Sequence, residues 1–155
     1  MRPGVRLRPI GVVRSPFKEP PDLPPPAFAP PRFFERSTGE IEIFPEFEPG
    51  LEGLEGFSHI IVLFHFHRSA AAKLKVVPPG ESKPRGVFAT RSPHRPNPLG
   101  LSVLRLLGRR GRVLDVSGLD LIDRTPVLDI KPYTRRDRKS HIRTGWLQER
   151  RRSRR

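Results

Sequence analysis

Proline constrains this chain more than any other residue type. The sequence has 20 prolines in 155 residues, and ten of them fall within residues 1–31. The clusters at 20–21, 24–26 and 30–31 exclude a helix there, because proline lacks an amide hydrogen and its ring clashes with the preceding helical turn. They predict an extended, semi-rigid segment.

Short runs of apolar and β-branched residues predict strands elsewhere. Residues 40–44 alternate acid and apolar side chains, which is typical of a half-buried strand, and residues 59–66 are nearly all apolar or aromatic, which predicts a strand buried on both faces. Further strands are expected at 5–14, 86–90, 101–107, 112–117 and 126–133. Residues 108–111 read as the link of a β-hairpin. Strands this short and frequent predict an all-β barrel or sandwich with no helix longer than two turns.

Several absences exclude whole classes of protein. The chain has no cysteine, which excludes a disulfide scaffold, a Cys-ligated zinc site, an iron–sulfur cluster and a thiol nucleophile. It has no Rossmann, P-loop or nucleophile-elbow motif. No apolar run approaches the roughly 18 residues of a membrane span, and the N-terminus does not resemble a signal peptide, so a cytoplasmic protein is expected.

The positive charge is concentrated toward the C-terminus. The formal net charge is +14, and residues 131–155 hold eleven of the 30 Lys and Arg with only two acids. Residues 40–55, in contrast, contain six glutamates and no base. This asymmetry predicts a polyanionic partner that is met on one side only. For residues 150–155 the alternative is a disordered, solubilising run of like charges.

Residues 91–102, RSPHRPNPLGLS, are the densest unusual segment. Three prolines fix the backbone of this loop. It presents four polar side chains: Arg91, His94, Arg95 and Asn97. Because rigidly held guanidinium and amide groups bind a carboxylate, a phosphate or a base edge at low ordering cost, we favour a functional loop over a purely structural connection.

The histidines raise the question of a metal site. His59, His65 and His67 share one parity and lie on one face of a regular strand. Two imidazoles at the spacing of His65 and His67 suit a metal, but His59 would be about 20 Å from His65. We therefore favour structural histidines or a cofactor contact, and assign no metal.

The acids near the last strands also have two interpretations. Asp120, Asp123 and Asp129 fall within ten positions, and the sequence from Asp123 to Pro126 has turn chemistry. Such a turn either caps backbone amides or holds an amine or hydroxyl of a ligand.

Eight short motifs between residues 9 and 133 occur in the order of a known family. They are IG at 10–11, SPFK at 15–18, GFSHI at 56–60, HFH at 65–67, GVFATR at 86–91, RPNPLG at 95–100, DLID at 120–123 and TPVLDIKPY at 125–133. Together they resemble the TsaA-like (TrmO-type) tRNA methyltransferases, which act on N6-threonylcarbamoyladenosine beside the anticodon.

The resemblance implies a small β-barrel, closed or partly open, that binds S-adenosylmethionine without a Rossmann sheet. It implies a homodimer with the cofactor near the subunit contact. We expect the methyltransferase-like barrel over residues 1–146 and a basic tail at 147–155. Carried over by position, the cofactor contacts would come from Pro24, Pro25, Pro26, His67, Arg68, Arg91, Leu101, Asp120, Leu121, Ile122, Asp123 and Thr125.

This sequence departs from the family pattern at two places. Pro25 and Pro26 stand where members tend to have Arg or another residue followed by Gln, so only backbone contacts with the cofactor are expected there. Arg124 stands where Gly is common, so the turn differs in shape or Arg124 reaches a phosphate. The chain resembles the short members that lack a second, tRNA-assisting domain, and the basic tail is expected to take over part of that role.

The implied reaction requires residues that accept a proton and residues that hold the RNA. In-line methyl transfer depends on positioning, and the accepting nitrogen needs a group that takes its proton. Asp123, Asp120 and His67 are the candidates of suitable type, and the sequence does not choose among them. The target base must leave its stack. The residues expected to hold the RNA are Arg95, Asn97, Arg124, Arg135, Arg136 and Arg138.

Two other functions stay open at this point. One is a non-catalytic RNA-binding barrel that has lost activity, as the altered prolines at 24–26 would allow. The other, less favoured, is a metal-dependent hydrolase that uses His65 and His67.

Overall fold

The computed structural model describes residues 4–23 and 34–148, so the expected cofactor segment at Pro24, Pro25 and Pro26 lies outside the described residues. The strands of this part are β1 (Gly11–Arg14), β2 (Thr38–Ile43), β3 (His59–His65), β4 (Lys75–Val76), β5 (Arg85–Gly86), β6 (Leu99–Arg110), β7 (Val113–Ser117) and β8 (Pro126–Pro132). The short 3-10 helices are η1 (Pro20–Asp22), η2 (Phe34–Arg36), η3 (Pro45–Leu51), η4 (Leu54–Gly56), η5 (Val87–Ala89) and η6 (Arg135–Asp137).

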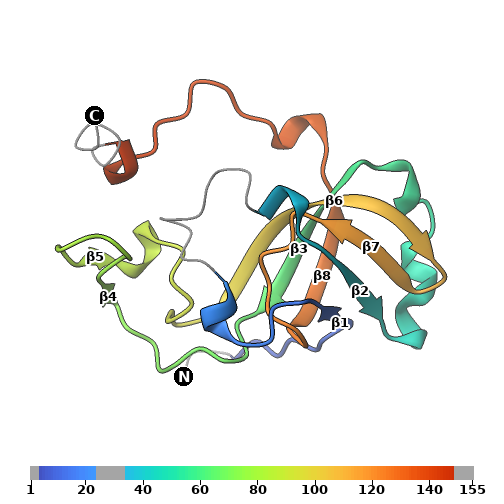
Figure 1. Cartoon of the computed structure of the whole chain (residues 1–155), viewed down its shortest axis with the longest axis horizontal. Coiled ribbons are helices and arrows are strands. Elements are labelled where there is room, and N and C mark those ends of the chain that lie inside the picture. Colours follow the sequence, from blue (N-terminus) through green and yellow to red (C-terminus); the bar gives the residue numbers. More distant parts are fainter. Residues whose placement is uncertain (1–3, 24–33, 149–155) are drawn as a thin grey trace.

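Six strands close into an antiparallel barrel in the order β1-β2-β7-β6-β3-β8 (Figure 1). The prediction of an all-β barrel is therefore confirmed, and the sandwich is excluded. The strands β4 and β5 form a separate two-stranded sheet within the connection that leads along the chain from β3 to β6. We call residues 68–97, which contain this sheet, the lobe. In Figure 1 the lobe lies at the opposite end of the molecule from η3 and η4.

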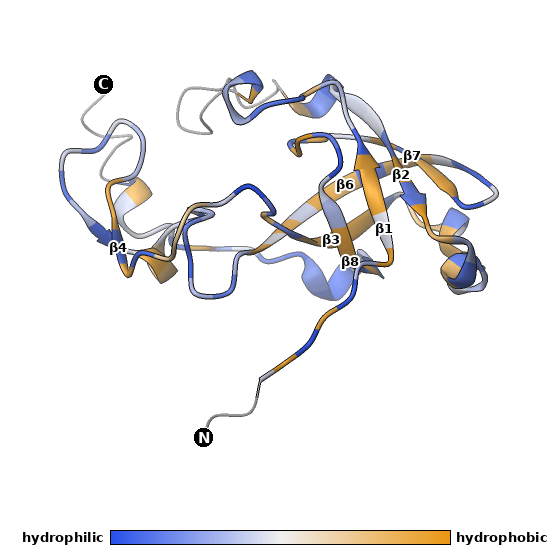
Figure 2. Cartoon of the chain, turned by 90° about the horizontal axis from the view of Figure 1, so that it is seen from below, coloured by the Kyte–Doolittle hydropathy of each residue, from blue (hydrophilic) through white to orange (hydrophobic). Residues whose placement is uncertain are grey.

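Side chains that point inward from the strands fill the barrel interior. In β3 every second residue is buried, and the same period runs through residues 102–106 of β6. Figure 2 shows apolar, orange stretches on the barrel strands. Fully buried side chains of the core include Val13, Ile41, Ile43, Ile60, Val62, Leu104, Leu114, Val116, Leu119 and Val127. The prediction that 59–66 is buried on both faces is wrong, because only the residues of β3 at even positions point into the core.

Three predicted elements differ in extent. Residues 5–9 precede β1 as an exposed, extended segment instead of belonging to the strand. The predicted strand at 86–90 is only β5 followed by η5, since the amide and hydroxyl of Thr90 both bond back to the carbonyl of Val87. The hairpin link is shorter than expected: β6 continues to Arg110, and Gly111 turns the chain with a φ of 59°.

The outer faces of the barrel differ in chemistry. Over β1, β2 and β7 they carry ion pairs, among them Arg112–Glu42 at 2.7 Å and Arg110–Asp115 at 2.8 Å. Over β3 and β6 the outer face includes five neighbouring apolar residues that are half-buried or exposed: Ile61, Leu63, Leu99, Leu101 and Val103. We call these five residues the β3–β6 face. No helix in the described ranges is long and apolar enough to cross a membrane.

Candidate cofactor and RNA site

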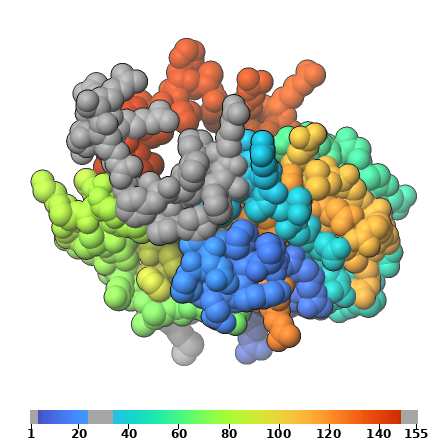
Figure 3. Space-filling view, in the orientation of Figure 1, coloured from blue at the N-terminus to red at the C-terminus, as the bar shows by residue number. Residues whose placement is uncertain are grey.

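The barrel topology brings the motif-bearing loops to one end. In the antiparallel order, β1, β3 and β7 end where β6 and β8 begin. The segments 15–23, 66–68, 91–98 and 118–125 therefore leave or enter the barrel at the same end, which we call the loop end. The lobe leaves from this end too, since it connects β3 to β6. In the space-filling view the blue loop at 15–23 lies beside the yellow-green lobe (Figure 3).

The carboxylate of Asp123 links the loop at 118–125 to the loop at 15–23. Its Oδ1 accepts a hydrogen bond of 2.9 Å from the Ser15 amide, and its Oδ2 lies 2.9 Å from Lys18 Nζ. Burial alone would raise the pKa of Asp123, but the Ser15 amide and the Lys18 ammonium outweigh it and hold the pKa below its ordinary value. With both oxygens engaged, Asp123 is a poor proton acceptor.

Asp120 has a different environment, although it lies only three positions earlier. The segment after β7 directs Leu119 and Leu121 into the core and leaves Asp120 accessible to solvent. The buried hydroxyl of Ser102 donates a hydrogen bond of 2.8 Å to Asp120 Oδ1. Although part of the residue is open to solvent, protein atoms packed around the carboxylate displace water and raise the pKa of Asp120. The Ser102 hydroxyl, a backbone hydrogen bond and the positive charge of Arg91 oppose this rise only in part. The loop before β6 thus brings the charge of Arg91 within electrostatic reach of Asp120.

His67 lies in a turn beyond the end of β3. Its amide donates to the carbonyl of His65 at 2.8 Å, so the regular strand that would place the histidines on one face ends at His65. Burial, the charge of Arg68 and the neighbouring His65 lower the pKa of His67, which favours the neutral form of its ring. His67 Nδ1 is buried and has no hydrogen-bond partner within the described residues. Such an atom suits a ligand contact.

The described residues offer no metal-ligand set. Among them, no group of three or more His, Asp or Glu side chains is placed to hold an ion. His59 is the first residue of β3, at the end of the barrel opposite the loop end. Its Nδ1 lies 2.9 Å from Ser58 Oγ, and its ring is tilted against that of Tyr133. The metal-dependent hydrolase therefore has no structural support in this part of the chain.

Several residues expected to contact the cofactor are buried in the core or bonded to other protein groups. Leu121 is 4% exposed and belongs to the core, and Thr125 is 3% exposed with its hydroxyl donating to the carbonyl of Ile122 at 2.7 Å. Ile122 is half-buried. Arg68 pairs with Glu19 of the 15–23 loop. Leu101, in contrast, is 50% exposed on the β3–β6 face.

Side chains of the proline-rich loop at residues 91–98 bond to nearby backbone groups. Arg95 Nη1 donates to the carbonyls of Thr90 and Ser92 at 3.1 and 3.2 Å. His94 Nδ1 accepts from the Ala70 amide at 3.1 Å, which joins the loop to the start of the lobe. Arg91 and Asn97 are exposed. The loop is thus a rigid support for Arg91, as its prolines predicted.

Arg124 adopts the conformation that glycine would favour. Its φ is 62°, and its amide donates to the carbonyl of Val13 at 2.8 Å. For a residue with a Cβ, the left-handed region costs roughly 1–2 kcal/mol. The turn therefore keeps a glycine-type shape, at the expense of backbone strain, and leaves the exposed Arg124 side chain at the loop end.

We expect Arg124→Gly to stabilise the chain by about 0.5–1 kcal/mol, since relief of strain exceeds the extra freedom of glycine in the unfolded state. Thermal unfolding should show a midpoint about 1–4 °C higher. Arg124→Ala keeps the Cβ and should leave the midpoint unchanged. A lower midpoint for the glycine variant would contradict the strain argument.

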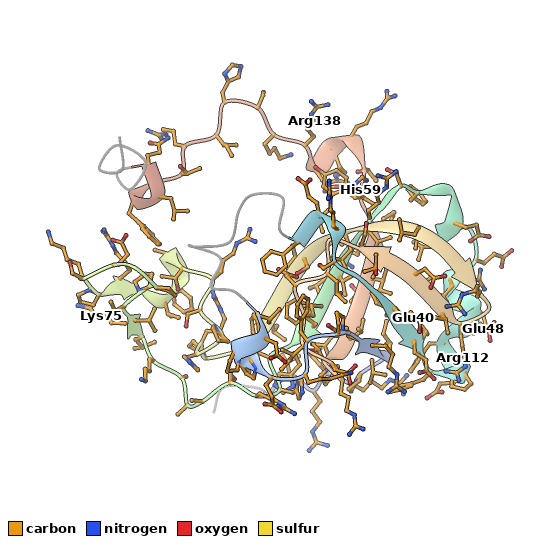
Figure 4. All side chains as sticks on the ribbon, viewed as in Figure 1. Glu40, Glu48, His59, Lys75, Arg112 and Arg138 are labelled. Carbon is orange, nitrogen blue, oxygen red and sulfur yellow. The ribbon has the colours of Figure 1, made fainter. Side chains whose placement is uncertain are left out.

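The structure separates the other predicted RNA-binding residues from this site. Arg135, Arg136 and Arg138 follow the far end of β8, near His59, about 20 Å from the loop end (Figure 4). The chain then returns to the lobe, where Trp146 Nε1 donates to the carbonyl of Ala89 at 2.9 Å and the Arg85 guanidinium lies 5.2 Å from the Trp146 ring centre.

Sequence reasoning missed two features of the site. Ser102 is a polar residue at a core-facing position of β6, and its parity with Leu104 and Leu106 was the available signal. The second feature is the charge of the lobe, which holds seven Lys and Arg against the single acid Glu81. The lobe places this charge at the loop end, whereas the glutamates of η3 and η4 lie at the other end of the barrel; Lys75 and Glu48 mark the two ends in Figure 4.

The fold and these loops belong to a family of barrel-type methyltransferase domains. Residues 12–137 match the tRNA-methyltransferase O N-terminal domain, and the chain belongs to that family. It is 48% identical over 143 residues to a probable S-adenosyl-L-methionine-binding protein of Pyrococcus abyssi, covering 92% of this chain and 76% of the relative. It is 50% identical over 94 residues to the human tRNA (adenine(37)-N6)-methyltransferase, covering 59% of this chain and 21% of the human protein.

A solved structure shares the fold. The crystal structure of TrmO from Pseudomonas aeruginosa superposes with a TM-score of 0.77 at 39% identity, over 95% of this chain. The present chain spans 63% of the length of that protein.

Proposed function

We propose that this chain transfers a methyl group from S-adenosylmethionine to N6 of an adenine in tRNA, and that the target is N6-threonylcarbamoyladenosine beside the anticodon. The observation that carries the proposal is the hydrogen bond from Ser102 to Asp120 at the loop end, with the charge of Arg91 in electrostatic reach and the basic lobe next to it. Membership of the tRNA-methyltransferase O family and the names of the relatives support both the cofactor and the tRNA substrate.

The residues at the loop end fit S-adenosylmethionine, which supplies an electrophilic methyl group when bound. His67 Nδ1 is buried without a partner in the described ranges and suits a hydrogen bond to the cofactor. Arg91 offers a guanidinium for the carboxylate of the cofactor, and Leu101 offers an exposed apolar surface. Asp120 is accessible beside them.

Asp120 is the candidate of the three that best suits proton acceptance. Methylation replaces an N–H bond by an N–C bond, so a proton must leave N6. Asp123 is held ionised by Lys18 and Ser15, which lowers its basicity, and the lowered pKa of His67 weakens that ring as a base. The raised pKa of Asp120 makes it the stronger base of the two carboxylates.

Arg91→Ala should weaken cofactor binding by about tenfold or more, because a charge-assisted hydrogen bond to a carboxylate is lost. Titration calorimetry with S-adenosylmethionine measures this change directly. Arg143→Ala, an exposed arginine outside the loop end, serves as the matched control and should bind like the wild type. Equal affinities for all three proteins would remove Arg91 from the cofactor site.

The proposed reaction is tested by methyl incorporation. The chain is incubated with S-adenosylmethionine carrying a labelled methyl group and with unfractionated tRNA, and digested nucleosides are analysed by mass spectrometry. We expect label in methylated N6-threonylcarbamoyladenosine. Binding of tRNA and cofactor with no label transferred would support the non-catalytic RNA-binding barrel instead.

We also propose that two copies of the chain pair through the β3–β6 face. Its five apolar residues form a continuous outer surface, while the opposite side of the barrel is covered by ion pairs. Leu101 belongs to both this face and the expected cofactor site, so pairing would bring a second copy near the cofactor. Sedimentation should show a dimer, and Val103→Asp should yield a monomer; a monomeric wild type would overturn the pairing.

A further inference from the structure

Phe88 is an exposed aromatic ring at the loop end that the site described above does not use. It lies in η5 with 76% of its surface exposed, whereas the preceding Val87 is 1% exposed. Isolated apolar side chains on a surface are common and need no explanation. Two properties, its rigid support and its charged surroundings, distinguish Phe88 from such a residue.

The backbone around Phe88 is held on both sides. The Val87 amide donates to the carbonyl of Leu74 at 2.9 Å, and Thr90 bonds back to the carbonyl of Val87 through its amide and its hydroxyl. On the other side, the carbonyl of Ala89 accepts the hydrogen bond from Trp146. The ring is therefore presented by an ordered turn, so a partner that stacks on it meets little ordering cost in the backbone.

The surroundings of Phe88 are basic. It belongs to the lobe, which holds seven Lys and Arg and one acid, and it lies three residues before Arg91, within about 11 Å along the backbone. Arg91 in turn acts on the charge of Asp120. A rigid exposed ring on a basic lobe, three residues from Arg91, is the kind of arrangement with which proteins bind unstacked bases of single-stranded RNA.

We propose that Phe88 stacks on an unpaired RNA base next to the adenine that is methylated. This inference rests on the proposed function, because it takes the bound polyanion to be the tRNA substrate. A second copy of the chain is the less suitable occupant, since two basic lobes brought together repel one another. The phosphates beside the stacked base would lie against the lobe cations, so the ring and the charges act on the same strand.

The test is tRNA affinity for variants of the full chain, measured by fluorescence anisotropy with labelled tRNA. Phe88→Ala should weaken binding by about 5- to 100-fold, the range that one base–aromatic stack contributes. Phe88→Trp should bind within about twofold of the wild type, because indole also stacks. Phe88→Leu keeps an apolar side chain but no ring, and should resemble Phe88→Ala.

Four further measurements separate stacking from other roles. The slope of log affinity against log salt should be the same for Phe88→Ala and the wild type, because Phe88 neutralises no phosphate. Val77→Ala, which shortens another exposed apolar side chain of the lobe, should leave tRNA affinity unchanged. S-adenosylmethionine affinity and the thermal midpoint should be unchanged in Phe88→Ala.

The inference is overturned if Phe88→Leu binds tRNA like the wild type, or if Phe88→Ala does. It is also overturned if Phe88→Ala dissociates a dimer in sedimentation, since the ring would then contact a second copy. These outcomes differ from failure of the proposed function, in which the wild type transfers no methyl group; affinity is measured independently of turnover.

Discussion

Replacing Asp120 by asparagine should lower kcat for methyl transfer by about 100-fold or more, measured at saturating S-adenosylmethionine and tRNA. The range reported for a positioned proton acceptor is roughly 10²–10⁴-fold. Asparagine keeps the size of the side chain and a carbonyl oxygen for the Ser102 hydrogen bond, but it does not take a proton. The effect should therefore fall on kcat far more than on KM for tRNA.

The pH profile distinguishes proton acceptance from simple binding. Asp120 must be ionised to accept a proton, so activity should fall as the pH falls through its pKa. Because burial raises that pKa, the acid limb should lie above the ordinary value of 3.8. The limb should be absent in Asp120→Asn.

Ser102→Ala offers a sharper check on the same carboxylate. The Ser102 hydroxyl stabilises the ionised form of Asp120, so its removal should raise the pKa and move the acid limb to higher pH. The plateau value of kcat should stay near that of the wild type. An acid limb that does not move would show that another group controls the pH dependence.

Asp123→Asn is the matched control, since it makes the same chemical change three residues away. Asp123 holds the Ser15 amide and the Lys18 ammonium, so its loss should lower the thermal midpoint and keep the acid limb. If Asp123→Asn loses kcat and Asp120→Asn does not, the assignment of the proton acceptor is reversed.

The different roles of Asp120 and Asp123 could not be predicted from the sequence. Both stand in one motif and have the same chemistry, so residue type does not separate them. Their environments come from partners distant in the chain: Ser102 lies 18 residues from Asp120, and Ser15 lies 108 residues from Asp123. Such pairings depend on barrel closure, which a single sequence does not specify at the level of side-chain contacts.

The barrel strands, in contrast, were predictable from local pattern. The alternation in 40–44 and 126–133 places β2 and β8 within two residues of their observed bounds. Prediction failed at 86–90, where a β-branched and aromatic run suggested a strand. There the hydrogen bonds of Thr90 to Val87 form a tight turn, and local side-chain-to-backbone bonding outweighs strand propensity. That failure concealed the turn that exposes Phe88.

Gly100→Ala should destabilise the chain by about 2–3 kcal/mol, because an added Cβ would overlap the ring of Phe64. The two residues are direct partners across β3 and β6, and the ring lies over the glycine. Phe64 also packs against Phe66, with ring centres 5.0 Å apart, and Phe66 precedes His67. Displacement of Phe64 should therefore weaken cofactor binding as well as stability.

Denaturant unfolding measures the stability effect, with two variants to locate its cause. Gly108→Ala lies in the same strand, where an added Cβ meets no atom within 4 Å, and should change stability by less than about 0.5 kcal/mol. In a Phe64→Leu background the ring is gone, so Gly100→Ala should cost about 1 kcal/mol or less. An undiminished cost in that background would mean that strain elsewhere in β6, and not the aromatic contact, requires glycine at position 100.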